Sequence, residues 1–151
     1  MDDQPRILNG TWTGSPVTDM GADEYCDTDF TVTGPFNPGD TLTIEISANG
    51  QANAPFMLYV AKNDLAMPLA PPPGIRHPLY GTVLLDGPHI AYGGPVLTGH
   101  LDASGNFFDN SSITIPGQTP IGLYVAMQAF ITDTASGTGQ GTNAATFRVG
   151  Y

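Results

Sequence analysis

The sequence predicts an all-β protein, an immunoglobulin-like β-sandwich of seven or eight short antiparallel strands. Glycine (19 residues) and proline (14 residues) recur along the whole 151-residue chain, which indicates many turns. Hydrophobic residues reach 40% and alternate with polar residues between those turns, as in half-buried strands. No segment sustains the 3.6-residue periodicity of an amphipathic helix. A jelly roll is the alternative arrangement of the same strands.

The chain length fits one sandwich domain with a short lead-in. A domain of about 150 residues buries roughly two thirds of its unfolded surface, so neither a disulfide nor a metal is needed to complete the core. Residues 1–27 show no periodicity and are expected to be an irregular lead-in, the end of a preceding domain. The sandwich is expected to span residues 28–151.

The first predicted strands are separated by strong turn signals. Residues 30–33 form a strand that the following Gly-Pro and Pro-Gly pairs end. Residues 40–49 show the clearest period of two, which predicts one solvated face and one buried face. The buried face consists of Leu42, Ile44 and Ile46.

The middle of the chain combines a buried strand with a proline-rich excursion. The apolar run 56–61 is typical of a strand that is buried on both faces. Residues 67–78 contain three consecutive prolines and are expected to form a surface loop. Further strands are expected at residues 80–86, 95–102 and 111–115, with a turn at residues 102–106.

The C-terminal part predicts two more strands. Residues 121–132 alternate over their whole length, so one face is expected to carry Leu123, Val125, Met127, Ala129 and Ile131. Segment 135–143 is almost purely Gly, Thr, Ser and Gln and is predicted to be a flexible hairpin loop. Residues 145–149 are the expected closing strand.

The charge balance limits the classes of partner. The chain has 14 acidic and 4 basic residues, for a formal net charge of -10. The basic residues form no patch, so nucleic-acid binding is not expected. No apolar run approaches the ~20 residues that cross a bilayer, so membrane insertion is not expected either. Low lysine content with abundant Gly, Thr, Asn and Asp favours an extracellular or cell-surface bacterial protein.

Residues 19–25, Asp-Met-Gly-Ala-Asp-Glu-Tyr, resemble a short signature that closes right-handed parallel β-helix domains of the pectate-lyase-like type in bacterial surface proteins. The region from Gly39-Asp40-Thr41-Leu42 to Gln128-Ala129 is similar to a β-sandwich module found C-terminal to such β-helices. The resemblance implies an extracellular location and a non-catalytic role. Because the start of the chain lacks the basic and apolar regions of a signal peptide, we expect a fragment of a longer protein.

An acidic segment is the candidate metal site. Oxygen ligands on irregular backbone suit Ca²⁺, but their spacing here does not match an EF-hand loop. A solvated acidic turn is therefore the preferred interpretation and calcium binding is the alternative, so no cofactor other than calcium is expected. The carboxylates are those of Asp19, Asp23, Glu24, Asp27 and Asp29.

Aromatic residues beside loops are the candidate ligand-binding site. Tyr80 and Tyr92 flank the proline-rich and glycine-rich loops, and Trp12 lies in the lead-in. Such rings combine an apolar face with a polar edge and can stack on sugars. Packing in the core or on the sheet surface is the competing interpretation.

No catalytic constellation is expected. The chain has no G-x-S-x-G motif, and Cys26 has no neighbouring base to activate its thiol. His77, His89 and His100 lack the spacing of a local zinc site. We therefore expect a non-enzymatic accessory module that acts in attachment, display or assembly.

Two other functions remain open at this point. One is a carbohydrate-binding module. The other is a structural subunit that self-associates by β-strand addition, with residues 1–18 as the donor segment.

Overall fold

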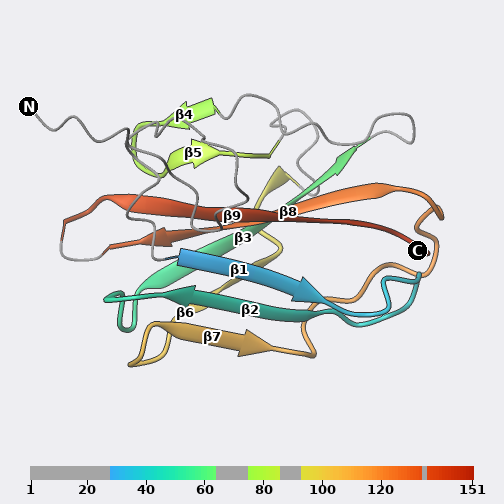
Figure 1. Cartoon of the computed structure of the whole chain (residues 1–151), viewed down its shortest axis with the longest axis horizontal. Helices are drawn as coiled ribbons and strands as arrows, with labels where there is room; N and C mark the ends of the chain where they lie inside the picture. The colour runs from blue at the N-terminus through green and yellow to red at the C-terminus, as the bar shows by residue number, and fades with distance from the viewer. Residues whose placement is uncertain (1–27, 64–74, 86–92, 134–135) are drawn as a thin grey trace, which may run out of the picture.

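The computed structural model describes residues 28–63, 75–85, 93–133 and 136–151, which form a β-sandwich as predicted (Figure 1). A three-stranded sheet has the order β1-β2-β7, and a four-stranded sheet has the order β6-β3-β8-β9. Neighbouring strands are antiparallel throughout. The bounds are β1 Thr28–Thr33, β2 Thr43–Ala48, β3 Pro55–Asn63, β6 Leu97–His100, β7 Asn106–Asp109, β8 Tyr124–Thr132 and β9 Gly139–Arg148.

This strand order is immunoglobulin-like. Strands β1, β2 and β7 occupy the places of strands A, B and E, while β3, β8 and β9 occupy those of C, F and G. Strand β6 joins the edge of the C-F-G sheet next to β3. Within the described ranges, no helix has the length and apolar character needed to cross a membrane.

The core lies between the two sheets and follows the predicted alternation. In β2, Ile44 and Ile46 are buried and Glu45 between them is exposed. In β8, Met127, Ala129 and Ile131 belong to the same inner core, so both predicted buried faces are confirmed.

The outer face of the four-stranded sheet carries a second, smaller apolar cluster. A hairpin of β4 (Ile75–His77) and β5 (Gly81–Val83) lies over this face, above β8 and β9 in Figure 1. Ala126 and Phe130 of β8 are buried in the cluster, together with Ala61 of β3. Strands β3 and β8 therefore have apolar contacts on both faces, which explains the continuous apolar run in β3.

The predicted loop at residues 135–143 is wrong for most of its length, because β9 begins at Gly139. A Cβ at Gly139 would collide with the Tyr80 ring and with the Ile131 carbonyl oxygen. Gly139 therefore has no room for a side chain beside Tyr80. Thr142 lies at a bulge in β9 opposite Ala129 of β8, and its hydroxyl oxygen accepts a hydrogen bond from the Ala129 N–H (3.1 Å).

The predicted strand at residues 111–115 is also wrong, since the strand of that region is β7 at Asn106–Asp109. The Asp109 carboxylate accepts hydrogen bonds from the N–H groups of Ser111 (3.2 Å) and Ser112 (3.0 Å), which turns the chain after β7. Ile113 and Ile115 still reach the core from this connection.

The proline-rich segment differs from the prediction at its end. Residues 75–77 were expected to belong to the loop at 67–78, but they form β4 and pair with β5. Strand β5 is shorter than the strand predicted at residues 80–86, and it pairs with β4 in the hairpin. Residues 64–74 and 86–92 lie outside the described ranges.

Candidate functional site

The side of the sandwich formed by β1 and β9, here called the closed side, has a covered edge. The N–H groups of Gly139 and Gly141 donate hydrogen bonds to the carbonyl oxygens of Leu79 (2.7 Å) and Tyr80 (2.8 Å). Beyond the end of β9, the Gly150 N–H donates to the Phe36 carbonyl oxygen (2.8 Å). These contacts occupy the first part of the free edge of β9 and the chain just beyond its end, which makes strand addition there less favourable.

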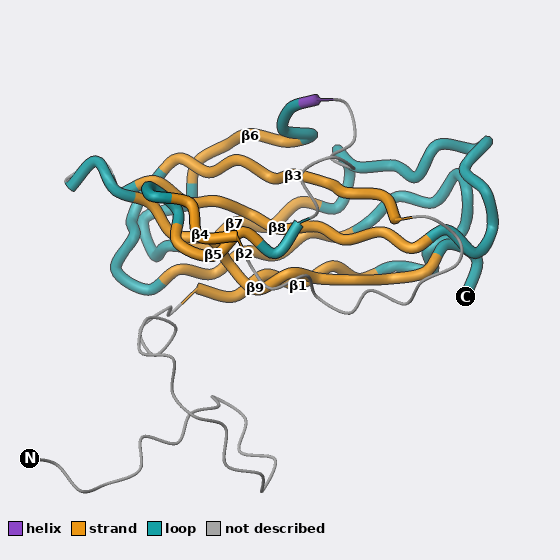
Figure 2. The backbone as a smooth tube through the Cα atoms, turned by 90° about the horizontal axis from the view of Figure 1, so that it is seen from above, coloured by secondary structure: helices purple, strands orange, loops and turns teal. Residues whose placement is uncertain are grey.

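Asn143 links the two sheets on the closed side. Its side-chain Oδ1 accepts a hydrogen bond from the Phe30 N–H (2.7 Å), and its Nδ2 donates to the Phe30 carbonyl oxygen (2.9 Å). The amide therefore pairs with β1 as another peptide group would. Figure 2 shows β1 and β9 together at one side of the molecule and β6 at the other.

The side of the sandwich formed by β6 and β7 is here called the open side. A cleft of about 420 Å³ lies between the sheets at one end of the sandwich. It is found where β3 ends and β8 begins, and the connection between β7 and β8 forms one wall. Leu42, Met127 and Val149 line it and are buried. Half-buried apolar side chains add to it, namely Val60, Val96, Ile113, Leu123 and Phe147. The connection between β7 and β8 also contributes polar residues: Ser112, Thr114, Gln118 and Thr119.

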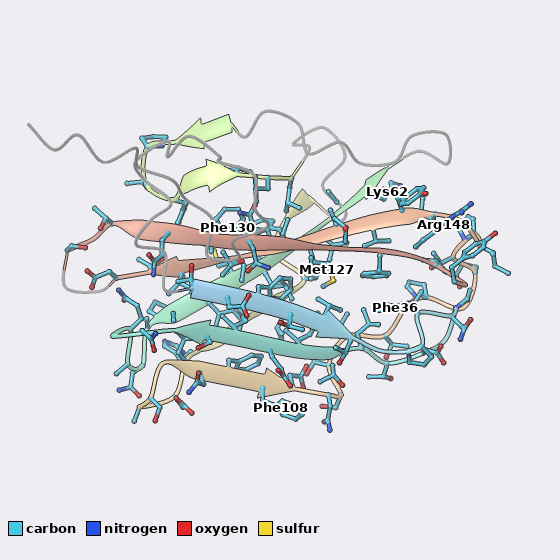
Figure 3. All side chains as sticks on the ribbon, in the orientation of Figure 1. Phe36, Lys62, Phe108, Met127, Phe130 and Arg148 are labelled. Carbon is cyan, nitrogen blue, oxygen red and sulfur yellow. The ribbon has the colours of Figure 1, made fainter. Side chains whose placement is uncertain are left out.

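Lys62 is the charged side chain of this lining among the described residues. It pairs directly with Val125 of β8, which pairs with Phe147 of β9. Directly opposed residues point to the same face of a sheet, so Lys62 occupies an inward-facing position in line with Phe56, Leu58 and Val60. Figure 3 shows Lys62 and Arg148 at the same end of the four-stranded sheet.

A shallower depression of about 290 Å³ lies on the outer face of the three-stranded sheet. Phe108 lines it and is 61% exposed, which is unusual for a large apolar side chain. Polar side chains surround the ring, among them Asp29, Glu45, Asp102 and Asn106. The register of β1, β2 and β7 brings these residues together, because Glu45 opposes both Thr31 and Phe108.

Of the five predicted calcium ligands, Asp29 alone lies in the described ranges. It is a β1 residue with an exposed side chain, and its Oδ1 accepts a hydrogen bond from the Phe30 N–H (2.9 Å). Asp19, Asp23, Glu24 and Asp27 lie outside the described residues. Within the described ranges, no group of three or more His, Cys, Asp or Glu side chains is placed to hold a metal.

Of the three predicted stacking aromatics, Tyr80 is described, whereas Trp12 and Tyr92 lie outside the described ranges. Tyr80 is half-buried, and its ring packs edge-on against Phe130 with the centroids 5.5 Å apart. It belongs to the cluster under the hairpin. A sugar-stacking role for the three residues stays a prediction.

Two residues of these sites were not singled out from the sequence. Lys62 could have been found from the period of β3, since Phe56, Leu58 and Val60 precede it at intervals of two. Phe108 gives no such signal, because its strand is short and its neighbour Phe107 is equally apolar.

Comparison of the chain with protein-family models, with curated proteins and with solved structures finds no match.

Proposed function

We propose that this chain is a non-enzymatic accessory module of a secreted or cell-surface bacterial protein, acting in attachment by holding an apolar group in the cleft between its sheets. The observation that supports this proposal is the apolar cleft itself. Its volume of about 420 Å³ falls within the range of small-molecule sites, about 300–1,000 Å³. The resemblance of residues 19–25 to a β-helix-closing signature supports a position C-terminal to a β-helix in a larger protein.

The scaffold around the cleft suits a binding role. Its floor consists of strands of the four-stranded sheet, in which β8 pairs with β3 on one edge and with β9 on the other. Rigid paired strands hold the lining side chains in fixed positions, which lowers the entropic cost of binding. For strand addition, the assembly alternative, the open side offers only short edge strands among the described residues, because β6 and β7 have four residues each.

Titration with Nile red, a neutral dye that fluoresces in apolar surroundings, tests the cleft. Val96→Phe places extra volume in the lining, so we expect it to weaken dye binding about tenfold, which corresponds to about 1.4 kcal/mol. Val32→Phe is the matched control, because Val32 is also half-buried but lies in β1 on the closed side. Equal binding by both variants, or no binding by the wild type, would refute the proposal.

Carbohydrate binding at the outer depression is a second candidate, favoured by the exposed ring of Phe108 among carboxylate and amide groups. An exposed ring can stack on a sugar while polar groups around it bind hydroxyls. A glycan array with the wild type and Phe108→Ala tests this function. We expect the variant to lose the signal and Thr33→Ala, which replaces an exposed β1 residue outside the depression lining, to keep it. An array without any bound glycan would exclude the candidate.

A further inference from the structure

We infer that the cleft accepts a fatty carboxylate, with the acyl chain among the apolar lining residues and the carboxylate at the Lys62 ammonium. This inference rests on the proposed function and names the ligand of the same cleft. It is carried by three observations: the position of Lys62, the charge of the lining, and a floor that presents side chains of β3 and β8.

The position of Lys62 places a cation where the strand pattern calls for an apolar residue. The inward-facing residues of β3 are Phe56, Leu58, Val60 and Lys62 in order, and the first two are fully buried. Lys62 follows at the point where the strand leaves the core, and its side chain is exposed. The long aliphatic stem can lie along the apolar lining while the ammonium stays in contact with water.

The lining carries this positive charge without a compensating carboxylate among the described residues. The chain as a whole has 14 acidic residues against 4 basic ones, yet the described lining of the cleft includes no Asp or Glu. The cleft is therefore a locally cationic site on an acidic protein. An anionic head group is attracted to it, and the surrounding negative surface disfavours anions elsewhere.

Arg148 shows by contrast that Lys62 is the cation available to a ligand. The Arg148 guanidinium lies over the rings of Tyr151 (4.1 Å) and Tyr124 (5.3 Å). Its Nε also donates a hydrogen bond to the Gly122 carbonyl oxygen (3.2 Å). Arg148 pairs with Tyr124 of β8. Its neighbour Phe147 pairs with Val125 and faces inward, and successive strand residues point to opposite faces, so Arg148 lies on the outer face.

The floor of the cleft favours an acyl chain over a peptide. The inner face of β3 and β8 presents side chains, because the backbone hydrogen-bonding groups of a strand lie in the plane of its sheet. A peptide inserted there would leave backbone N–H and C=O groups without partners, at a substantial cost in free energy. An acyl chain carries no such groups, and its apolar surface matches the aliphatic lining.

Titrations with three ten-carbon amphiphiles below their micelle concentrations test the head-group preference. Decanoate is anionic, decanol is neutral and decyltrimethylammonium is cationic, so the tail is constant. Isothermal calorimetry gives the affinities, and ¹H–¹⁵N spectra locate the binding through the amides of Val60, Ile113 and Leu123. We expect decanoate to bind at least about tenfold more tightly than decanol, with the cation weakest.

Variants of the two basic residues assign this preference. Lys62→Met is expected to bind decanoate and decanol with equal affinity. Lys62→Arg is expected to keep the preference for decanoate, because it keeps the positive charge. Arg148→Met is the matched control and should keep the wild-type order, because Arg148 lies on the outer face. Unchanged preference in Lys62→Met would overturn the inference.

Failure of the ligand assignment can be told apart from failure of the cleft. Equal affinity of the wild type for decanoate and decanol, with Nile red still bound in the cleft, would refute the fatty carboxylate and leave the binding cleft intact. Tighter binding of an apolar pentapeptide with a free C-terminus would refute it in favour of a peptide. Absence of any amphiphile or dye binding would refute both proposals.

Discussion

The closed and the open sides of the sandwich are built from the same kinds of residue but differ in how far those residues are buried. One row of the three-stranded sheet compares them directly, because Ile46 of β2 pairs with Phe30 on the closed side and with Phe107 on the open side. Phe30 is 1% exposed, whereas Phe107 is half-buried. On the closed side the contacts of β1 and β9 join the two sheets, whereas on the open side the Phe107 ring stays partly exposed.

The largest expected effect separates these two phenylalanines. Phe30→Ala should lower the free energy of unfolding by about 3–5 kcal/mol, because it leaves a cavity in a fully enclosed position. Phe107→Ala should cost about half as much, although its ring packs on Phe56 with the centroids 4.5 Å apart. Urea unfolding measures both. If Phe30→Ala does not fold, Phe30→Leu and Phe107→Leu give the same comparison at smaller amplitude, and equal costs would contradict the distinction between the sides.

The next effect concerns the link between the sheets. Asn143→Ala removes both hydrogen bonds to the backbone of Phe30, so we expect a loss of about 1–2 kcal/mol in unfolding free energy. The Asp29 carboxylate still accepts from the Phe30 N–H, which limits the loss. Thr146→Ala, at an exposed position of the same strand, should stay within about 0.5 kcal/mol of the wild type. A similar loss in both variants would contradict a stabilising role for the two hydrogen bonds between Asn143 and Phe30.

A smaller effect of opposite sign is expected at the cleft. Lys62→Met should raise the free energy of unfolding by about 0.5–1 kcal/mol, because an apolar side chain suits an inward-facing position better than an ammonium. The melting temperature should rise by roughly 2 °C, as measured by calorimetry without ligand. A gain in stability together with the loss of decanoate preference would show that Lys62 favours binding in the cleft at the expense of stability. A lower melting temperature would show that Lys62 stabilises the fold.

The smallest effect is a pH dependence on the open side. Burial opposes ionisation of Asp109, but hydrogen bonds from Ser112 and Ser111 outweigh it and hold the pKa of this carboxyl below its usual value of 3.8. A lowered pKa in the folded state contributes stability above pH 3.8, and this contribution is lost as the pH falls through the folded-state pKa. Asp109→Asn should therefore cost about 0.5 kcal/mol at pH 7, since solvent screens the exposed turn.

Urea unfolding of wild type and Asp109→Asn at pH 7 and in the acid range checks this. The difference between them should shrink as the pH falls below 3.8. A difference that stays constant with pH would assign the cost to the shape of the side chain and not to its charge.

The sequence by itself determined the fold class and the inner faces of the main strands. The period of two in β2 and β8 identifies Ile44, Ile46, Met127 and Ile131 as core residues, because a strand with one face in the core must alternate. The continuous apolar run in β3 likewise indicates burial on both faces, which the hairpin of β4 and β5 provides.

Tertiary structure decided the elements that carry no apolar period. The first half of β9 consists of small polar residues, and it is a strand because Leu79, Tyr80 and Phe30 supply partners from distant parts of the chain. Strand β7 is defined by its pairing with β2, since a strand of four residues is too short to show a period. Local composition cannot reveal such strands, because their hydrogen-bond partners are remote in sequence.

The candidate sites show the same division. The sequence predicted sites at acidic and aromatic residues that lie near one another along the chain. Of these residues, Asp29 and Tyr80 lie in the ranges that the structure describes. The cleft depends instead on the packing of β3, β8, β9 and the connection after β7, and it is visible only when the sheets face each other. Lys62 is an ordinary charged residue in the sequence; the register that places it opposite Val125 makes it part of the cleft.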